Sequence, residues 1–269
     1  MAINMADTNV EKYPLFRQIT AHTKQFPVMS ETVDQIVEAT IFKFFKPKNI
    51  IELGAATGNW CALHHSLCKG YIDQHYTLVE DFSWCASGNV NYKFSTEFEF
   101  PTNKTQLEQH LTGVIDSFTV IDTTLDLLIE TDVTEKFDLI RLDCDPTTGD
   151  KMNELVAWID RNGSDRLIVL SDDIKTTVAP HRMLLLQQLV AQGKMNTMWI
   201  GEDTAAWCRP AMLDEISDWY AALKSISEAE LVDLDYYNLK LYGYPQCFLS
   251  TKRTDSYQLQ HRNNTDGRT

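Results

Sequence analysis

The segment from Asn49 to Trp60, with the sequence NIIELGAATGNW, has the make-up of a ligand-binding turn. A short apolar run carries an acid, Glu52, near its end, and glycines follow at Gly54 and Gly58. Glycine adopts positive φ without strain and lets a ligand come close to the main chain. The pattern therefore predicts a buried strand that turns sharply into a helix beside a bound ligand.

Two familiar nucleotide sites do not fit this spacing. A phosphate-binding loop needs Lys followed by Ser or Thr after its last glycine, and Asn59 and Trp60 stand there instead. The dinucleotide fingerprint G-x-G-x-x-G needs a glycine two residues after the first, where this chain has Ala56. What remains is the pattern E-x-G-x-x-x-G, which runs from Glu52 to Gly58.

Carboxylates also close the apolar runs that are typical of buried strands. Parallel strands bring their carboxyl ends to one edge of a sheet, and ligands collect at that edge. Five consecutive runs with an acid at the end are difficult to attribute to chance, although the chain has 38 acidic residues. The acids at these positions are Glu52, Glu80, Asp122, Asp143, Asp172 and Asp173.

Glu80 ends the second apolar run, roughly twenty residues beyond the glycine turn. A carboxylate at this place can accept hydrogen bonds from two ribose hydroxyls. An ordinary surface acid is the alternative, and Asp81 is a neighbouring candidate for the same role. Because the apolar run ends on Glu80, we predict that Glu80 binds the ribose.

Asp143, Asp172 and Asp173 follow two runs that would be neighbours in a parallel sheet. Carboxylates that converge without a cation repel each other and raise one another's pKa values. A hard divalent ion removes that conflict, and oxygen ligands suit magnesium, manganese or calcium. The alternative is structural, with Asp172 and Asp173 capping the next segment and Asp143 binding backbone amides. We predict a metal at these three residues.

These residues need a framework of alternating strands and helices. A helical pattern spans Val33 to Phe44, where Ser30 is placed to cap it and Pro47 to stop it. Residues 81–103 read as an irregular insertion, and Glu202 with Asp203 would form a hairpin turn. The order favours an α/β fold with a doubly wound, Rossmann-like, mostly parallel seven-stranded sheet and an antiparallel edge hairpin. Strands are predicted up to residue 53 and at 76–80, 118–122, 137–143, 166–170, 197–201 and 204–208, and helices at 61–69, 105–114, 152–159 and 181–191.

Length and composition favour one substantial core with additions at its ends. The chain has 269 residues, 43% of them hydrophobic, and a formal net charge of −14. This charge repels phosphate backbones and anionic lipids, so nucleic acid is an unlikely partner and no membrane association is expected. The six cysteines lack zinc or C-x-x-C spacing, and the N-terminus has no signal-peptide pattern. We expect a cytoplasmic protein.

Taken together, these segments resemble class I S-adenosylmethionine (SAM) methyltransferases. The stretch from Pro27 to Glu31, the helix after it and the turn at 51–58 look like the opening of the metal-dependent small-molecule O-methyltransferases of the catechol, caffeoyl-coenzyme A and macrocin types. The segments FDLIRLDCD, at 137–145, and LIVLSDD, at 167–173, resemble the two metal-bearing strands of that group. The likeness covers about residues 27–210.

The resemblance implies a SAM-dependent enzyme that transfers a methyl group to a hydroxyl of a small molecule with help from a divalent metal, magnesium before manganese or calcium. The metal ligands would be Asp143, Asp172 and Asp173. The glycines would admit the methionine part of SAM, and Asp122 with Thr123 would hold the adenine. The full set of implied cofactor-binding residues is Glu52, Gly54, Ala55, Gly58, Trp60, Glu80, Asp122, Thr123 and Asp143.

One position departs from that group. The catechol-type enzymes have a lysine base three residues after the first metal aspartate, and here the position is Pro146. Metal coordination can take over part of that task by lowering the pKa of the acceptor hydroxyl. The candidate catalytic residues are therefore Asp143, Asp145 and His181, although a lone histidine that opens a helix is more often structural.

Two other functions stay open. A metal-independent enzyme on this fold would methylate nitrogen, carbon or an RNA 2′-hydroxyl, and Gly58-Asn59-Trp60 is similar to the glycine-glycine-tryptophan of ribosomal-RNA and cap 2′-O-methyltransferases. Their lysine-aspartate-lysine-glutamate set is not recognisable here, and the acidity opposes RNA. A non-catalytic SAM-binding scaffold is the other alternative, which the missing lysine and the acidic C-terminal segment favour.

The chain divides into four predicted parts. They are an N-terminal helical segment at 1–47, a SAM-binding methyltransferase domain at 48–210, a C-terminal extension at 211–253 and a disordered tail at 254–269. The extension is acidic and rich in Tyr and Leu, which suits a lid or a contact in a homo-oligomer. The tail is polar and suits a frayed end.

Overall fold

The computed structural model of the chain describes most of the predicted core. Several sequence predictions lie outside the described residues: the Ser30 cap, the middle of the insertion at 84–100, the Glu202-Asp203 turn and everything after residue 230. The described residues are 22, 25–26, 32–70, 73–83, 101–131, 133–174, 180–201 and 204–230.

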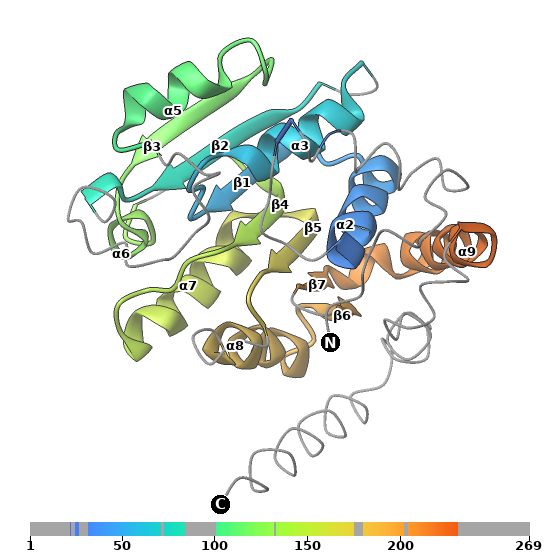
Figure 1. Ribbon diagram of the computed structural model, residues 1–269. Coiled ribbons are helices and arrows are strands. Elements are labelled where there is room, and N and C mark those ends of the chain that lie inside the picture. Colours follow the sequence, from blue (N-terminus) through green and yellow to red (C-terminus); the bar gives the residue numbers. More distant parts are fainter. Residues whose placement is uncertain are drawn as a thin grey trace, which may run out of the picture.

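A seven-stranded sheet forms the centre of the molecule, with the strand order β3-β2-β1-β4-β5-β7-β6 (Figure 1). Strands β1 to β5 pair in parallel, whereas β7 runs antiparallel to both β5 and β6. The predicted doubly wound sheet with an antiparallel edge hairpin is therefore confirmed. The strands are β1 (Asn49–Leu53), β2 (His75–Glu80), β3 (Phe118–Asp122), β4 (Phe137–Leu142), β5 (Gly163–Ser171), β6 (Asn196–Ile200) and β7 (Ala205–Cys208).

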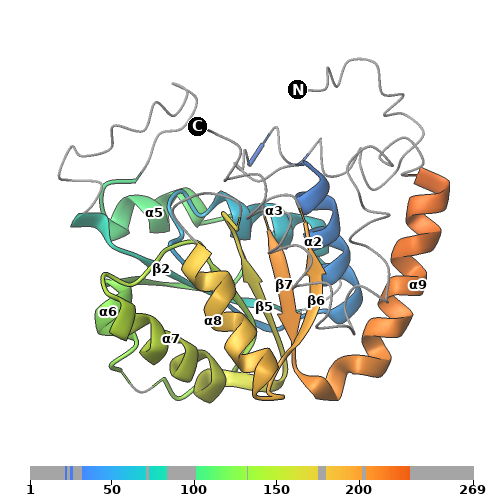
Figure 2. The same cartoon turned by 90° about the horizontal axis from the view of Figure 1, so that it is seen from below.

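Helices cover both faces of the sheet. Helices α2, α3 and α5 lie on one face and α6, α7 and α8 on the other, while α9 stands at the β6 edge (Figure 2). The helices are α2 (Thr32–Phe45), α3 (Asn59–Cys68), α5 (Lys104–Leu111), α6 (Leu125–Leu128), α7 (Gly149–Asn162), α8 (Pro180–Ala191) and α9 (Leu213–Glu230), and a 3₁₀ turn, η3, spans Pro210–Met212. None of the helices in the described ranges combines the length and the apolar character that a bilayer crossing needs.

The central strands are apolar at successive positions because both of their faces are buried. Successive side chains of a strand point to opposite faces, so Ile50 packs with α2 and α3 while Ile51 packs with α7 and α8. Leu139 and Ile140 of β4 divide in the same way. This leaves the strand ends as the place where polar side chains gather.

The start of the predicted C-terminal extension packs onto the core. Trp219 of α9 is buried, and its indole Nε1 donates to Thr40 Oγ1 of α2 at 3.0 Å. The hydroxyl of Tyr220 donates to the carbonyl of Met198 in β6. Helix α9 therefore connects the edge hairpin to α2. The predicted domain boundaries stay predictions.

Candidate functional site

The glycine turn between β1 and α3 has the backbone geometry that the sequence predicts. Gly54 has φ of 88° and Gly58, the N-cap of α3, has φ of 71°. The amides of Gly54 and Ala55 both donate to the carbonyl of Val79, at 3.0 and 3.1 Å. The turn is thus bonded to the neighbouring strand β2 at the carboxyl edge of the sheet.

Both glycines are also required by contacts inside the protein. A Cβ atom at position 54 would lie 2.9 Å from the carbonyl oxygen of Asp143 and 3.0 Å from Cys144 Cβ. At position 58 it would lie 3.1 Å from side-chain carbons of Leu107 and Leu111 in α5. Close packing and positive φ explain the two glycines, so their presence alone does not identify a ligand.

Glu80, at the end of β2, holds the glycine turn. Its Oε2 accepts a hydrogen bond from the amide of Ala56 at 2.6 Å. Burial raises the pKa of this carboxyl, and the Ala56 amide acts in the opposite direction. Asp122 is the register partner of Glu80 at the end of β3, and the Thr123 amide donates to the Glu80 carbonyl at 3.1 Å. Three predicted cofactor-binding residues therefore meet at one corner.

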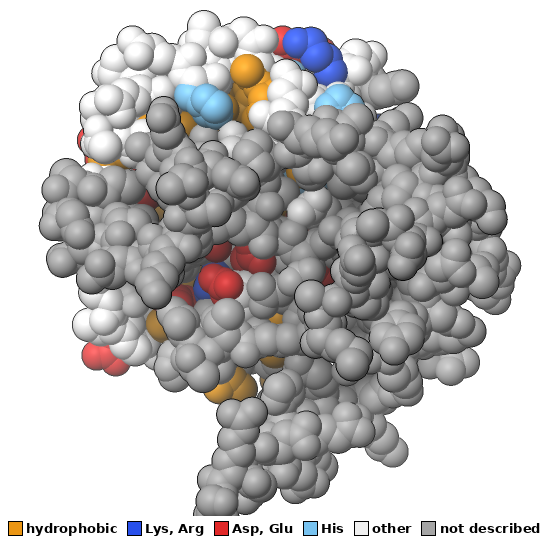
Figure 3. Space-filling model, viewed as in Figure 1, with side chains coloured by type: hydrophobic (Ala, Val, Ile, Leu, Met, Phe, Trp, Pro, Cys, Tyr) orange, Lys and Arg blue, Asp and Glu red, His pale blue; other side chains and the backbone are white. Residues whose placement is uncertain are grey.

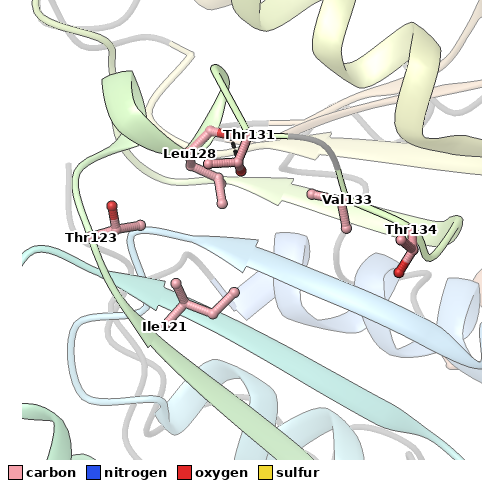
Figure 4. A pocket seen from close by; sticks show the side chains of 6 residues that line it. All are labelled: Ile121, Thr123, Leu128, Thr131, Val133 and Thr134. Atoms are coloured by element: carbon pink, nitrogen blue, oxygen red, sulfur yellow. Dashed lines mark hydrogen bonds between the residues drawn. The ribbon is translucent and has the colours of Figure 1, made fainter.

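A cavity of about 330 Å³ opens beside Thr123. Figure 4 shows that its lining comes from the end of β3, from α6 and from the segment that leads into β4. Aliphatic and threonine side chains alternate in its wall, so it is suited to a flat, mostly apolar group with a few polar edges. The lining residues are Ile121, Thr123, Leu128, Thr131, Val133 and Thr134.

Arg141 of β4 lies at the centre of the carboxyl edge. Its Nη1 is 2.8 Å from Glu52 Oε1 and 2.6 Å from Asp143 Oδ2, and its Nη2 contacts Asp172 Oδ2. The side chain is only 4% exposed, and its guanidinium stands 4.9 Å from the ring centre of Trp60. One arginine thus joins the ends of β1, β4 and β5.

A second arginine, Arg182 of α8, approaches the same edge from the other side of the sheet. Its Nε is 2.9 Å from Asp145 Oδ1, its Nη2 is 3.9 Å from Asp173 Oδ2, and its Nη1 donates to the Leu142 carbonyl at 2.6 Å. Figure 3 shows acidic side chains around a basic one near the middle of the face that carries this edge. Both arginines pair with carboxylates of the predicted catalytic set.

The predicted metal ligands do not fit a divalent ion in this arrangement. Asp143 and Asp172 each direct an oxygen at Arg141, and Asp173 Oδ2 lies 3.9 Å from Nη2 of Arg182. An ion at these oxygens would stand beside two guanidinium groups and be repelled by them. Among the described residues, no group of three or more His, Cys, Asp or Glu side chains is arranged to hold a metal.

Buried carboxyls at this edge have unusual acidities. Burial raises the pKa of Glu52 to about 8, although Arg141 and the Cys61 thiol favour the ionised form. Burial and the charge of Asp172 raise the pKa of Asp143, again against Arg141. Burial lowers the pKa of Arg141, but the charges of Asp143, Asp172 and Glu52 raise it by a larger amount. The net pKa is well above the ordinary value, so the guanidinium stays charged. The edge therefore contains a permanent cation among acids that protonate easily.

Two of the implied cofactor residues lie behind the edge. Glu52 is 1% exposed and its second oxygen accepts from the Cys61 thiol at 3.0 Å. Trp60 is 4% exposed, and its Nε1 donates to Glu38 Oε2 of α2 at 2.9 Å, where His64 also contacts that oxygen at 3.3 Å. Glu52 and Trp60 therefore lie in the interior, where they support the glycine turn from beneath.

The remaining predicted residues divide by accessibility. Asp145 and Asp173 have side chains that are 25% and 44% exposed, and Asp173 has φ of 59°, a left-handed conformation that aspartate tolerates better than most residues. Ala55 is buried in the turn. His181 belongs to the first turn of α8, and its side chain lies outside the described residues.

Sequence reasoning missed both arginines. A signal for Arg141 was present, because an arginine within the apolar run FDLIRL must find a partner when the strand is buried. Residues two apart on a strand share a face, which puts Arg141 beside Asp143. No comparable signal marked Arg182, whose contact depends on how α8 packs on the sheet.

Comparison with other proteins identifies the fold. No protein-family model and no curated protein matches the chain. The cofactor-bound structure of Rv0187 from MTB is similar to it with a TM-score of 0.50 at 14% identity, covering 75% of this chain and 92% of that one. The O-methyltransferase TomG from Streptomyces achromogenes, in complex with SAM, gives a TM-score of 0.47 at 11% identity, with 75% and 92% covered. The O-methyltransferase from Bacillus cereus in complex with SAH (S-adenosylhomocysteine) gives 0.47 at 13%, with 76% and 93% covered. At these identities the similarity concerns the fold.

Proposed function

We propose that this protein is a SAM-dependent methyltransferase that transfers a methyl group to a hydroxyl of a small molecule. The observation that carries the proposal is the hydrogen bond between Glu80 and the Ala56 amide, which joins a strand-end acid to the glycine turn. An acid in this position can bind ribose hydroxyls beside a backbone that admits the rest of the cofactor. The shared fold with a cofactor-bound protein supports the same conclusion.

The charge of the carboxyl edge supports SAM over a polyphosphate nucleotide. Arg141 and Arg182 face more carboxylates than they can neutralise, since they contact Asp143, Asp145, Asp172 and Asp173 in addition to Glu52, whose raised pKa keeps it largely protonated at neutral pH. The excess negative charge attracts a cationic ligand and repels phosphate groups. SAM carries a positive sulfonium and an ammonium group, so it suits this edge.

The proposal assigns a part of SAM to each segment of the edge. The main chain at Gly54, Ala55 and Gly58 would contact the methionine part, while Glu80 would bind the ribose. Asp122 and Thr123, beside the cavity at the end of β3, would hold the adenine. Glu52 and Trp60 would act from behind, by holding Arg141 and the turn.

Methyl transfer from a sulfonium is an in-line displacement. The enzyme has to align the acceptor oxygen with the methyl group and remove the hydroxyl proton. Asp143, Asp145 and His181 are the proposed groups for positioning the acceptor or taking that proton. Assistance by a divalent metal at Asp143, Asp172 and Asp173 stays a prediction, which the pairing of these residues with arginine does not favour.

Calorimetry with SAH and SAM tests the proposal first. We expect the purified full chain to bind both with a one-to-one stoichiometry. Turnover of SAM to SAH is then measured with a panel of phenols, sugars and small peptides as acceptors. A protein that binds neither SAM nor SAH would end the proposal, and one that binds them but methylates none of the panel would favour the scaffold alternative.

A further inference from the structure

Five acidic side chains meet at the ends of three adjacent strands, and cations or bound protons must offset the repulsion among them. Glu52 comes from β1, and Asp143 and Asp145 follow β4. Asp172 and Asp173 follow β5. The strand ends are held close together, since the amide of Asp143 donates to the Leu53 carbonyl at 2.8 Å and that of Asp172 to the Leu142 carbonyl at 3.0 Å. The main chain therefore holds the ends of β1, β4 and β5 together.

Arg141 supplies the first cation from within the sheet. It contacts one oxygen each of Glu52, Asp143 and Asp172, and the last two belong to the predicted metal ligands. Its register partner on β1 is Glu52, so the position of the guanidinium follows from strand pairing and does not depend on a loop. The aromatic ring of Trp60 closes the remaining side.

Arg182 supplies the second cation from a helix. Its side chain is 2% exposed and reaches both Asp145 and Asp173, the two most accessible acids of the cluster. Its bond to the Leu142 carbonyl fixes the guanidinium against the end of β4. Leu142 therefore receives hydrogen bonds from both Asp172 and Arg182, which aligns β4, β5 and α8 at one point.

We propose that Arg141 and Arg182 are the built-in cations of this site, which position the five carboxylates in the role that a divalent metal would otherwise have. Both are positioning residues, because they act through the acids. One consequence of this inference rests on the proposed methyl transfer: the reaction should proceed without a divalent ion. The contacts between the two arginines and the five acids do not depend on which reaction the protein catalyses.

Metal titration of the full-length wild type tests the proposal directly. We expect no saturable Mn²⁺ binding by calorimetry, and the same melting temperature in EDTA and in millimolar Mg²⁺. SAH affinity should agree within about twofold between the two conditions. Stoichiometric Mn²⁺ binding that Asp173→Asn abolishes would overturn the proposal, and so would SAH binding or turnover that EDTA removes and Mg²⁺ restores.

The variant Arg182→Gln provides a gain-of-response test. Removal of this guanidinium takes one cation away from Asp145 and Asp173, so we expect a lower melting temperature that Mg²⁺ now raises. The matched control is Arg166→Gln, which breaks an exposed ion pair with Glu215 at 2.6 Å and should show no response to Mg²⁺. A folded Arg182→Gln protein that ignores Mg²⁺ would contradict the proposal.

The two proposals fail in different ways. If SAH does not bind in any condition, methyl transfer is wrong, but Mn²⁺ titration and melting still decide the role of the arginines. If Arg182→Gln does not fold, the wild-type Mn²⁺ titration decides the question by itself. Arg182→Lys, which keeps a cation, should remain insensitive to Mg²⁺, and a Mg²⁺-dependent melting temperature in that variant would count against the proposal.

Discussion

Arg141 stands directly opposite Glu52 in the parallel register of β4 and β1, with 2.8 Å between Nη1 and Oε1. Arg141 is buried together with Glu52, so its loss removes the cation that Asp143 and Asp172 also contact inside the protein. We expect Arg141→Met to lower the free energy of unfolding by about 3–5 kcal/mol, measured by urea denaturation. Arg166→Met, which removes an exposed ion pair with Glu215, should lower the free energy of unfolding much less. Equal losses in the two variants would show that the buried contacts of Arg141 stabilise the fold no more than an exposed pair does.

Alanine substitution of glycines separates backbone strain from packing. Gly54 and Gly70 have similar φ values of 88° and 83°, but a Cβ at Gly70 meets nothing within 4 Å. Both variants should lose about 1–2 kcal/mol from positive φ. Gly54→Ala should lose about 1–3 kcal/mol more, because its Cβ meets the backbone of Asp143. Thermal or urea unfolding measures both, and equal losses would disprove the packing requirement.

Glu80→Gln tests the ribose assignment. The amide oxygen can still accept from Ala56, so the turn should persist, but the charge that favours ribose hydroxyls is lost. We expect SAH affinity to fall by about tenfold, or 1.4 kcal/mol, by calorimetry. The control is Asp81→Asn. The carboxylate of Asp81 accepts a hydrogen bond from the Ser83 hydroxyl, and its replacement should leave the SAH affinity unchanged. A larger effect at Asp81 would transfer the role to that residue.

The acidity of Glu52 predicts a pH-dependent stability. Its pKa is about 8 in the folded protein against an ordinary value near 4.5, mainly because it is buried. The folded state therefore keeps a proton that the unfolded state releases, and the contribution of this group to stability falls as pH rises from about 4.5 to 8. Above pH 8 the contribution stays level.

Glu52→Gln cannot titrate and should remove that part of the slope. Urea denaturation of wild type and variant gives the difference in free energy of unfolding at each pH. The range from about pH 5 to pH 8 lies between the ordinary pKa of a glutamate and that of Glu52 in the folded protein. Glu154→Gln, an exposed acid on α7 paired with Lys151, is the control that should keep the wild-type slope. Parallel curves for wild type and Glu52→Gln would refute the assignment.

Trp60→Phe distinguishes support of the turn from contact with the cofactor. The change removes the hydrogen bond to Glu38, a buried acid whose other oxygen has no hydrogen-bond partner within the described part of the chain. We expect a loss of about 1–3 kcal/mol in stability with SAH affinity nearly unchanged. Trp219→Phe, which loses a similar bond to Thr40 away from the edge, is the control. A tenfold loss of affinity confined to Trp60→Phe would instead give it a direct cofactor role.

The sequence was sufficient for most of the fold because burial on both faces leaves a strong apolar signal. Strand β3 has the predicted bounds, 118–122, and β1, β2 and β4 agree within a residue. Strand β5 begins at Gly163, before the predicted residue 166, where its pairing with β4 is irregular. Helix α6 was not predicted, since a helix of only Leu125–Leu128 has too few residues for a periodic pattern.

The candidate site was harder to predict because its contacts cross between elements. The acids were located correctly at the strand ends, but their partners were not. The pairing of Arg141 with Glu52 follows from the register of two strands, and that of Arg182 with Asp145 follows from the rotation of α8. Neither is encoded in local spacing. The acids do converge at the strand ends, and arginine side chains contact them there.

The contacts of Arg141 join segments that lie far apart along the chain. Glu52 precedes Arg141 by 89 residues and Asp172 follows it by 31, so these two contacts form only when β1, β4 and β5 have come together, whereas Asp143 is two residues from Arg141. Contacts that form after the rate-limiting step slow unfolding and have little effect on the folding rate. We expect these two contacts of Arg141 to form after that step, so that its loss shortens the lifetime of the native state and leaves the folding rate nearly the same.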